Sequence, residues 1–302
     1  MRPRPAVSAL PDTGRMVWRS GGIAWHGGVP GLRWEGGRVS ALSRGRDIAF
    51  RAVGERRCAG ARGNPCPVAA VVAGRGTGGR CADCARLDRA HSVAADTLAD
   101  DPRPYRVYLA WFGPGMVKVG ITAEQRGDAR LLEQGAVAFS WLGRGPLMAA
   151  RRTEEVLRHA LAVPDRIPYA RKRAVRHALP PVEERAHEVR ELYGRAVGVG
   201  VWAETLEALP CEVRDHGDVF GIGDLPPYDG SVVELVPGGV VSGRLLAAAG
   251  PDLHLLDPSG RHLALDTRLM SGWALEAAAA GHAVTVPVTA ALTGEDAQEQ
   301  LF

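Results

Sequence analysis

The chain has 302 residues, of which 46% are hydrophobic and 24% are charged, values typical of globular proteins large enough for more than one domain. No uninterrupted apolar run approaches the ~20 residues of a membrane-spanning helix. The first residues contain arginines without the apolar core of a secretory signal. The composition therefore argues against membrane and secreted proteins, and we expect a cytoplasmic protein with no membrane partner.

The net charge of +3 hides an uneven distribution along the chain. Residues 201–302 contain 15 acidic and 4 basic residues, which leaves a net charge of +14 on residues 1–200. Residues 144–176 alone hold nine Arg or Lys against three acidic residues. Such an excess of positive charge predicts DNA or RNA as a partner. A solvated arginine-rich helix is the alternative interpretation.

Residues 1–57 are predicted to form a β-rich segment. Short runs of β-branched and aromatic residues alternate here with Gly-Gly pairs at 21–22, 27–28 and 36–37, which indicates strands joined by turns. Three tryptophans lie in this segment. Tryptophan in a small sheet usually fills the core, so we favour packing over stacking on nucleic-acid bases.

Four of the five cysteines lie within 27 residues, in a segment that we assign to residues 58–99. They are Cys58, Cys66, Cys81 and Cys84. In a reducing compartment this grouping predicts a structural zinc site, because the two-residue spacing of the second pair puts two thiolates on one turn. A redox pair is the alternative for the second pair, and His91 could replace one ligand. Four protein ligands leave no open position on zinc, so we expect this ion to stabilise the fold.

Residues 100–200 are predicted to form an α/β domain that begins with a hairpin. Two runs rich in β-branched and aromatic residues flank Gly113-Pro114-Gly115, as in antiparallel strands joined by a tight turn. A polar helical run, a third strand and a longer helix follow. The expected elements lie at 106–112 and 116–121 for the hairpin, at 137–141 for the third strand and at 147–162 for the longer helix.

The hairpin carries motifs that resemble a known family. Val107-Tyr108 and Lys118-Val119-Gly120-Ile121-Thr122, followed by Arg on one helix and Glu on the next, resemble the GIY-YIG nuclease domain, in the branch whose second motif reads Lys-Ile-Gly. The resemblance covers roughly a fifth of the chain. With the four cysteines upstream, the whole chain looks like a bacterial family without an assigned function that couples such a domain to a zinc module.

The resemblance implies a site for hydrolysis of phosphodiester bonds. In GIY-YIG nucleases a glutamate binds a divalent ion, an arginine faces the phosphate and the motif tyrosines help to activate the nucleophile. By position, Tyr108 matches the first tyrosine and Lys118 replaces the second, with Mg²⁺ or Mn²⁺ as the implied cofactor. Lys118 could hold a phosphate or accept a proton. Two features depart from the family: Arg106 occupies the place of the first-motif glycine, and the late asparagine has no counterpart.

The arginine of this site is either Arg126 or Arg130. Because the two are four residues apart, one helix would project both from one face. We favour Arg130, because Leu131 and Leu132 follow it directly and their burial would anchor it.

The metal-binding acid is either Glu154 or Glu155. Glu154 lies on the apolar stripe of the predicted helix, where a carboxylate needs a metal or an arginine as partner. Glu155 lies at the edge of the stripe and could pair with His159. The stripe consists of Leu147, Ala150, Leu157 and Leu161.

Basic side chains on and after this helix are the predicted contacts with nucleic acid. They are Arg151, Arg152, Arg158, Arg171, Lys172 and Arg173.

Residues 201–302 are predicted to form a small β-barrel-like domain, because short β-type runs recur there at regular spacing with turns between them. The acidic balance argues against a second polyanion site and leaves a protein partner open. We expect Cys211 to be a small buried side chain and residues 294–300 to be disordered.

The sequence as a whole predicts an α+β fold with four parts, at residues 1–57, 58–99, 100–200 and 201–302. The leading functional hypothesis is divalent-metal-assisted cleavage of nucleic acid. A zinc-containing protein that binds nucleic acid without cleaving it is the second hypothesis. The third is a protein-interaction scaffold.

Overall fold

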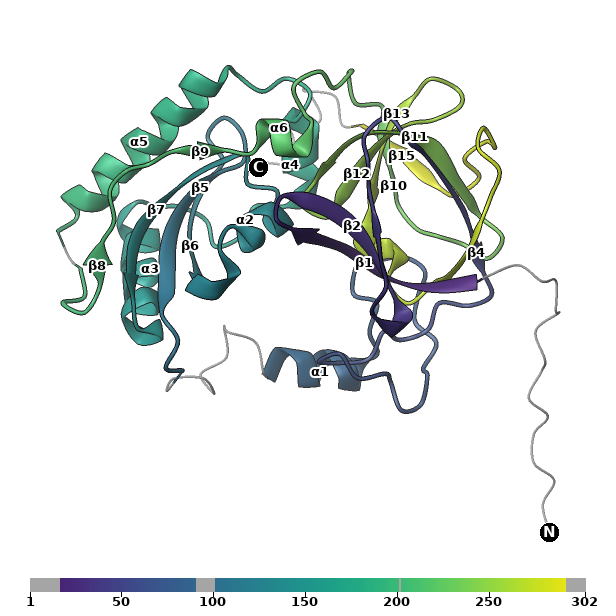
Figure 1. The fold of residues 1–302 in the computed structure, drawn as a ribbon, viewed down its shortest axis with the longest axis horizontal. Coiled ribbons are helices and arrows are strands. Elements are labelled where there is room, and N and C mark those ends of the chain that lie inside the picture. Colours follow the sequence, from purple (N-terminus) through teal and green to yellow (C-terminus); the bar gives the residue numbers. More distant parts are fainter. Residues whose placement is uncertain (1–16, 91–100, 201, 292–302) are drawn as a thin grey trace, which may run out of the picture.

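A computed structural model describes residues 17–90, 101–200 and 202–291, and every structural statement below is confined to them. His91 and the C-terminal tail for which disorder is predicted lie outside these residues. The fold is mixed α+β and contains two sheets, the small sheet at the left of Figure 1 and the large sheet at the right. Among the helices described, none is both long enough and apolar enough to span a membrane.

The large sheet has ten strands in the order β15-β10-β13-β12-β11-β4-β14-β1-β2-β3. Its N-terminal strands are β1 Val17–His26, β2 Val29–Trp34, β3 Val39–Ala41 and β4 Asp47–Val53, and its C-terminal strands are β10 Gly230–Val232, β11 Val240–Ala249, β12 Asp252–Leu256, β13 His262–Asp266, β14 Ala274–Ala277 and β15 Val288–Ala290. Neighbouring strands are antiparallel except for β10 and β13, which are parallel.

Strands from the N-terminal part of the chain pair with strands from the C-terminal part in this sheet, which is the main departure from the expected layout. β4 lies between β11 and β14, with Phe50 opposite Val241 and Ala52 opposite Leu275. The strand order has two free edges over the described residues, so the C-terminal barrel prediction is corrected to an open sheet. Alternating sequence patterns identify strands but do not identify their partners, so the sequence gives no sign that β4 pairs with β11 and β14. The domain limits themselves stay a prediction.

The small sheet has the order β6-β5-β7-β8, with β9 also paired to β7. Its strands are β5 Tyr105–Trp111, β6 Val117–Ala123, β7 Ala138–Gly145, β8 Glu207–Ala208 and β9 Arg214–Asp215. The predicted hairpin is confirmed as β5 and β6, because Tyr105 pairs with Ala123 and Trp111 with Val117. The turn closes with a hydrogen bond from the Phe112 nitrogen to the Met116 oxygen at 2.9 Å.

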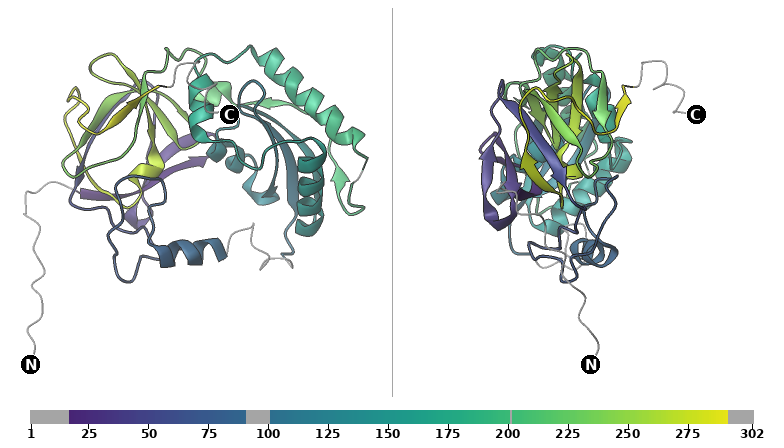
Figure 2. Two further views of the ribbon diagram at one scale, coloured as in Figure 1. Left: turned by 180° about the vertical axis from the view of Figure 1, so that it is seen from behind. Right: turned by 90° about the vertical axis from the view of Figure 1, so that its right-hand side faces the viewer.

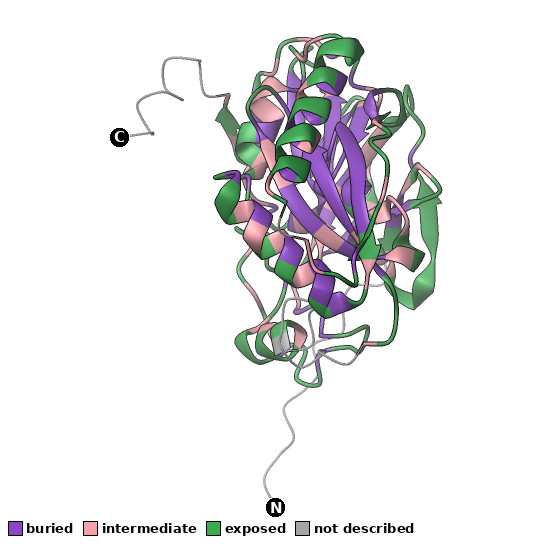
Figure 3. Cartoon of the chain, turned by 90° about the vertical axis from the view of Figure 1, so that its left-hand side faces the viewer, coloured by how far each residue is buried: buried purple, intermediate pink, exposed green. Residues whose placement is uncertain are grey.

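Helices cover both faces of the small sheet. These helices are α2 Ala129–Gln134, α3 Leu147–Ala160, α4 Tyr169–Val175 and α5 Val182–Gly198, whereas the single turn α6 Gly217–Phe220 packs on the large sheet. The apolar side chains of α3 and α5 share one core with Val107 and Leu109 of β5. Side chains from α2 and α4 pack on the other face with Tyr108 and Phe139. Figure 3 views the molecule from the left-hand side of Figure 1, where α5 lies, and shows buried strands behind helices with exposed outer faces.

The two sheets meet through α4 and the turn between β11 and β12. Arg173 forms ion pairs of 2.7 Å with both Asp252 and Asp266, and Arg176 pairs with Asp252 at 2.6 Å. Trp25 of β1 donates from its indole nitrogen to the Gly250 oxygen at 3.1 Å and is 5% exposed, as expected for a tryptophan that packs. The ion pairs of Arg173 and Arg176 therefore connect α4 with the large sheet, and the Trp25 contact lies within that sheet.

Candidate functional site

A cavity of about 670 Å³ opens at the β6 edge of the small sheet, where the layers on both faces meet. It is lined from β5, β6, α2, α3 and the segment after α3. All side chains that the sequence singles out for chemistry in this domain line it. They are Tyr108, Lys118, Arg126, Arg130, Glu154 and Glu155. The arginine alternatives and the glutamate alternatives therefore face one space.

Tyr108 is the most enclosed of these residues, at 1% exposed. It stands opposite Gly120 in the β5–β6 register, and its ring covers the Gly120 Cα. A Cβ at position 120 would overlap the Tyr108 hydroxyl, so the glycine of the second motif is required by packing against the tyrosine of the first. Burial raises the pKa of Tyr108 against the opposing charge of Arg130, so the phenol is neutral at physiological pH.

Glu154 and Lys118 bring opposite charges into the same cavity, and each charge affects the pKa of the other. Glu154 is half-buried, and burial raises its pKa while the Lys118 charge opposes the rise. Burial lowers the pKa of Lys118, and the charges of Asp165 and Glu154 oppose that change. Within the described part of the chain, Glu154 forms no ion pair at 4.0 Å or less. Its carboxylate is therefore available to a ligand in the cavity.

Glu155 is more exposed and less suited to a buried role. The contact that links it to His159 is a main-chain one, with the His159 Nδ1 2.8 Å from the Glu155 oxygen. The expected side-chain pair is therefore replaced by a helix-terminal contact. Of the two glutamates, Glu154 is therefore the more enclosed by the cavity.

Arg126 and Arg130 do not lie on one continuous helix. Arg126 ends a 3₁₀ turn, Glu124–Arg126, and the chain breaks at Gly127, whose φ of +49° is left-handed. Arg126 is held by Glu133 through contacts of 2.7 and 2.8 Å, whereas Arg130 lies 3.8 Å from that carboxylate. Leu131 and Leu132, at 0% and 1% exposed, anchor α2 as predicted. Arg130 is thus the less occupied cation.

Four of the six predicted nucleic-acid contacts have side chains that reach the cavity or the surface. Arg151 and Arg158 line the cavity. Arg152 and Arg171 are exposed outside it.

The expectation of a surface contact is wrong for the other two, Lys172 and Arg173, because both side chains make contacts in the interior of the protein. Lys172 is 4% exposed and donates from Nζ to the Gln134 oxygen at 3.0 Å, with Nζ 3.8 Å from the Phe112 ring centroid. Burial lowers its pKa to about 7. The Arg173 side chain is 12% exposed between Asp252 and Asp266. A basic run in the sequence becomes internal here, because α4 is packed between the sheets.

Several lining residues were not predicted from the sequence. Arg103, Asp165 and Arg166 add charge to the cavity wall. Arg103 is oriented by Asp101, which accepts from its Nε at 2.9 Å. Thr122 contributes a buried hydroxyl without a hydrogen-bond partner in the described ranges. These polar residues lie in loops or near the end of a strand. No periodicity in the sequence there indicates which way a side chain points.

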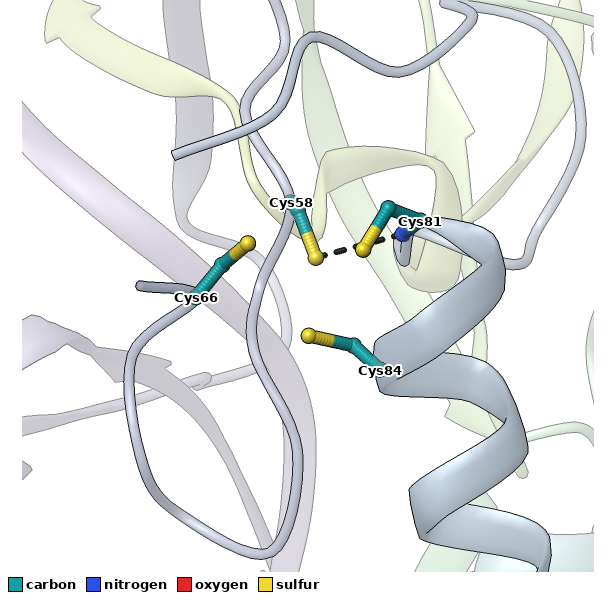
Figure 4. A group of neighbouring side chains, drawn as sticks. All are labelled: Cys58, Cys66, Cys81 and Cys84. Atoms are coloured by element: carbon teal, nitrogen blue, oxygen red, sulfur yellow. Dashed lines mark hydrogen bonds between the residues drawn. The ribbon is translucent and has the colours of Figure 1, made fainter. Parts of the chain in front are cut away.

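The four cysteines form a second candidate site, shown in Figure 4. Their sulfur atoms all lie within 4.8 Å of one another. Cys81 and Cys84 lie at the start of helix α1, Ala82–Ala90, and the other two come from the preceding loop. This donor set suits a tetrahedral thiolate site, so the cysteines can hold a metal ion such as zinc, as predicted. His91 is outside the described residues.

The surroundings of the four sulfur atoms affect their pKa values in opposite directions, and a bound cation would favour the thiolate form of each. Main-chain hydrogen bonds from Ala70 and Val68 lower the pKa of Cys66 to about 7. Burial and the neighbouring thiols raise the pKa of Cys84 to about 12. Four thiolates this close repel one another, and a bound metal ion removes that penalty because it stabilises each thiolate directly.

Arg56 attaches the cysteine loop to the large sheet. It is 2% exposed and donates to main-chain oxygens, including those of Ala73 and Gly76 in the loop and Arg268 and Ser271 beyond β13. The loop and α1 lie at the lower edge of the molecule in Figures 1 and 2, away from α5.

Cys211, expected to be buried, is instead exposed. It lies in the segment between the two-residue strands β8 and β9, in a pocket that it shares with Val182 and Ala186 of α5.

Comparison with known proteins returns one family. No curated protein and no solved structure matches the chain. A family model described as "Protein of unknown function (DUF2797)" matches residues 45–275. The match includes the four cysteines, the small sheet, the strands β4 and β10 to β13 of the large sheet and the whole cavity lining, and it covers about three quarters of the chain. The chain therefore belongs to the DUF2797 family.

Proposed function

We propose that the central domain is a GIY-YIG-like unit that hydrolyses phosphodiester bonds in nucleic acid with the help of a divalent ion. The observation that carries this proposal is the cavity itself, in which Tyr108, Lys118, Arg130 and Glu154 meet. These are the residue types and motif positions that the resemblance implies. They come from four separate elements, the strands β5 and β6 and the helices α2 and α3, so their convergence is not a consequence of sequence proximity.

The charge of the cavity supports an anionic substrate. Seven cationic side chains line it, against three carboxylates. The cations are Arg103, Lys118, Arg126, Arg130, Arg151, Arg158 and Arg166. Phosphate groups of DNA or RNA are the polyanion that such a surface attracts, and the attraction should weaken steeply with salt.

Glu154 is the residue that would hold Mg²⁺ or Mn²⁺. Both ions prefer oxygen ligands, usually few from the protein and the rest from water and phosphate, and the half-buried Glu154 carboxylate, which has no ion pair among the described residues, fits that preference. Bound there, the ion would offset the charge that develops on the phosphate.

The other side chains would bind and orient the substrate. Arg130 would face a phosphate oxygen, because the guanidinium donates two parallel hydrogen bonds. Tyr108 would donate a hydrogen bond from its hydroxyl group to an oxygen of the substrate, and its buried ring would keep that group in one position. Lys118, with its lowered pKa, would hold a phosphate as a cation or accept a proton when neutral.

A second candidate function uses the same cavity without cleavage. Lys118 stands where a nuclease of this type usually has tyrosine, and a protein that only grips phosphates needs cations more than it needs a metal ligand. Binding of nucleic acid without turnover would produce the same salt dependence.

Labelled single-stranded, double-stranded and branched nucleic acids, incubated with Mg²⁺ or Mn²⁺ or with chelator, would separate these functions. We expect metal-dependent cleavage that Glu154→Gln lowers by about 100-fold or more. Glu191→Gln, an exposed change on α5, is the matched control and should cleave normally. Salt-sensitive binding without cleavage would support the second function. Absence of both binding and cleavage would refute both.

A further inference from the structure

The buried face of α2 carries a hydrogen bond that the proposed roles do not use. Gln134, the last residue of α2, is 8% exposed, and its Nε2 donates to the Tyr108 hydroxyl oxygen at 2.9 Å. Arg130 lies one helical turn earlier, so both side chains approach Tyr108 from one face of the helix. Tyr108 is therefore contacted by a neutral donor and a cation from the same six-residue element.

This hydrogen bond determines what the hydroxyl of Tyr108 can do. A phenol has one hydrogen to donate and oxygen lone pairs that accept. Because Gln134 supplies the N–H in their contact, the O–H of Tyr108 is not used there and can donate to an anionic oxygen in the cavity. A neutral, oriented phenol is suited to donating a hydrogen bond and unsuited to removing a proton.

Gln134 is itself held from the side of the large sheet. Its main-chain oxygen accepts from Lys172 of α4 at 3.0 Å. The next residue, Gly135, ends α2 with a left-handed φ of +71°. A Cβ on Gly135 would lie 2.7 Å from Nη2 of Arg176 and 3.3 Å from the nitrogen of Gly250, in the turn between β11 and β12. The end of α2 is thus fixed between α4 and the large sheet.

We propose that Gln134 is a positioning residue for Tyr108, and that α4 and the large sheet keep it in place. The large sheet then has a role in the cavity, although it contributes no side chain to the cavity wall. The effect on cleavage rests on the function proposed above. The hydrogen bond itself can be tested without cleavage.

A double-mutant cycle tests whether Gln134 acts through Tyr108. Gln134→Met keeps the length of the side chain and removes the donor. We expect it to lower the cleavage rate by about 10- to 100-fold, as for a misplaced reacting group, with the Kd for an oligonucleotide changed less than about twofold. In the Tyr108→Phe background the same change should have no further effect. An equal loss in both backgrounds would overturn the proposal, since Gln134 would then act on the fold alone.

Nuclear magnetic resonance of protein labelled with ¹³Cζ-tyrosine provides a readout that needs no activity. The chain has five tyrosines, and the Tyr108 signal is the one lost in Tyr108→Phe. Gln134→Met should shift this signal and leave the other four in place. An unchanged Tyr108 signal would overturn the proposal. If the wild-type protein binds oligonucleotides without cleaving them, the proposed function fails, and the Tyr108 signal still decides whether Gln134 positions the phenol.

Discussion

The four-cysteine site and the cavity hold their side chains in place by different means. At the cysteine site the sulfur atoms lie within 4.8 Å of one another, so one bound cation would contact all four. In the cavity no single group does this. Tyr108 is held by Gln134 and Gln134 by Lys172, which brings in helices from different parts of the chain. The first site should therefore depend on its ion, and the second on the packing of its neighbours.

Removing one thiolate should produce the largest effect and should be confined to the first site. We expect Cys84→Ser to reduce the zinc content from about one per chain to near zero. The cysteine loop and α1 should lose about 3 kcal/mol or more of stability, because the binding free energy of a structural zinc ion is folding free energy. Zinc released on denaturation measures the content, and hydrogen exchange compares α1 with α2.

Cys211→Ser is the matched control for this change, because Cys211 is exposed and far from the other cysteines in the sequence. It should keep the zinc and the protection of α1. Full zinc content in Cys84→Ser would contradict a four-cysteine site. Loss of protection in α2 as well as in α1 would show that the cavity also depends on the ion.

Overpacking the cavity should have a smaller effect, confined to the second site. In Gly120→Ala the new methyl group meets the Tyr108 hydroxyl, which cannot move away because its ring is buried and bonded to Gln134. We expect a loss of about 1–3 kcal/mol in the free energy of unfolding, measured with urea, and a normal zinc content.

Gly223→Ala is the control for the added methyl group, since a Cβ at position 223 would meet no atom within 4 Å. Its unfolding midpoint should match that of the wild-type protein. Equal midpoints for Gly120→Ala and Gly223→Ala would show that the contact between Tyr108 and Gly120 is loose.

The same contrast explains what could be predicted from the sequence. The cysteine cluster and the β5–β6 hairpin are built from residues close together in the chain, so their spacing and turn chemistry predict them. The apolar stripe of α3 is predicted for the same reason, because helical periodicity acts over a few residues. Glu154 could be selected on that stripe before its surroundings were known.

Contacts between distant segments could not be predicted in this way. Nothing near Arg173 in the sequence indicates that Asp252 and Asp266 will lie beside it, so a basic run is read as surface. The insertion of β4 between β11 and β14 leaves no local signal either. Gln134 is a polar residue at a helix end, and its role depends on where Tyr108 and Lys172 lie after folding.

The pH dependence of the unfolding free energy should show the smallest effect. It tests the free-energy cost of burying the Lys172 amine beside the cavity. Burial lowers the pKa of Lys172 to about 7, whereas an exposed lysine titrates near 10.4. Between these values the unfolded chain binds more protons than the folded chain, so the free energy of unfolding should rise with pH and fall as pH decreases toward 7. One such group contributes at most about 1.4 kcal/mol per pH unit.

Urea unfolding at pH 7, 8 and 9 would measure this rise, and Lys172→Met is the variant that isolates it. Methionine keeps the apolar contact with Phe112 but has no proton to lose. We expect the difference in unfolding free energy between wild type and Lys172→Met to move in favour of the wild type as pH increases. A difference that stays constant with pH would mean that Lys172 keeps its charge when buried, held by the Gln134 oxygen and the aromatic rings of Phe112 and Tyr169. In that case Gln134 would be held by a charged lysine, and the cavity would depend on a buried cation, as the cysteine site depends on its metal ion.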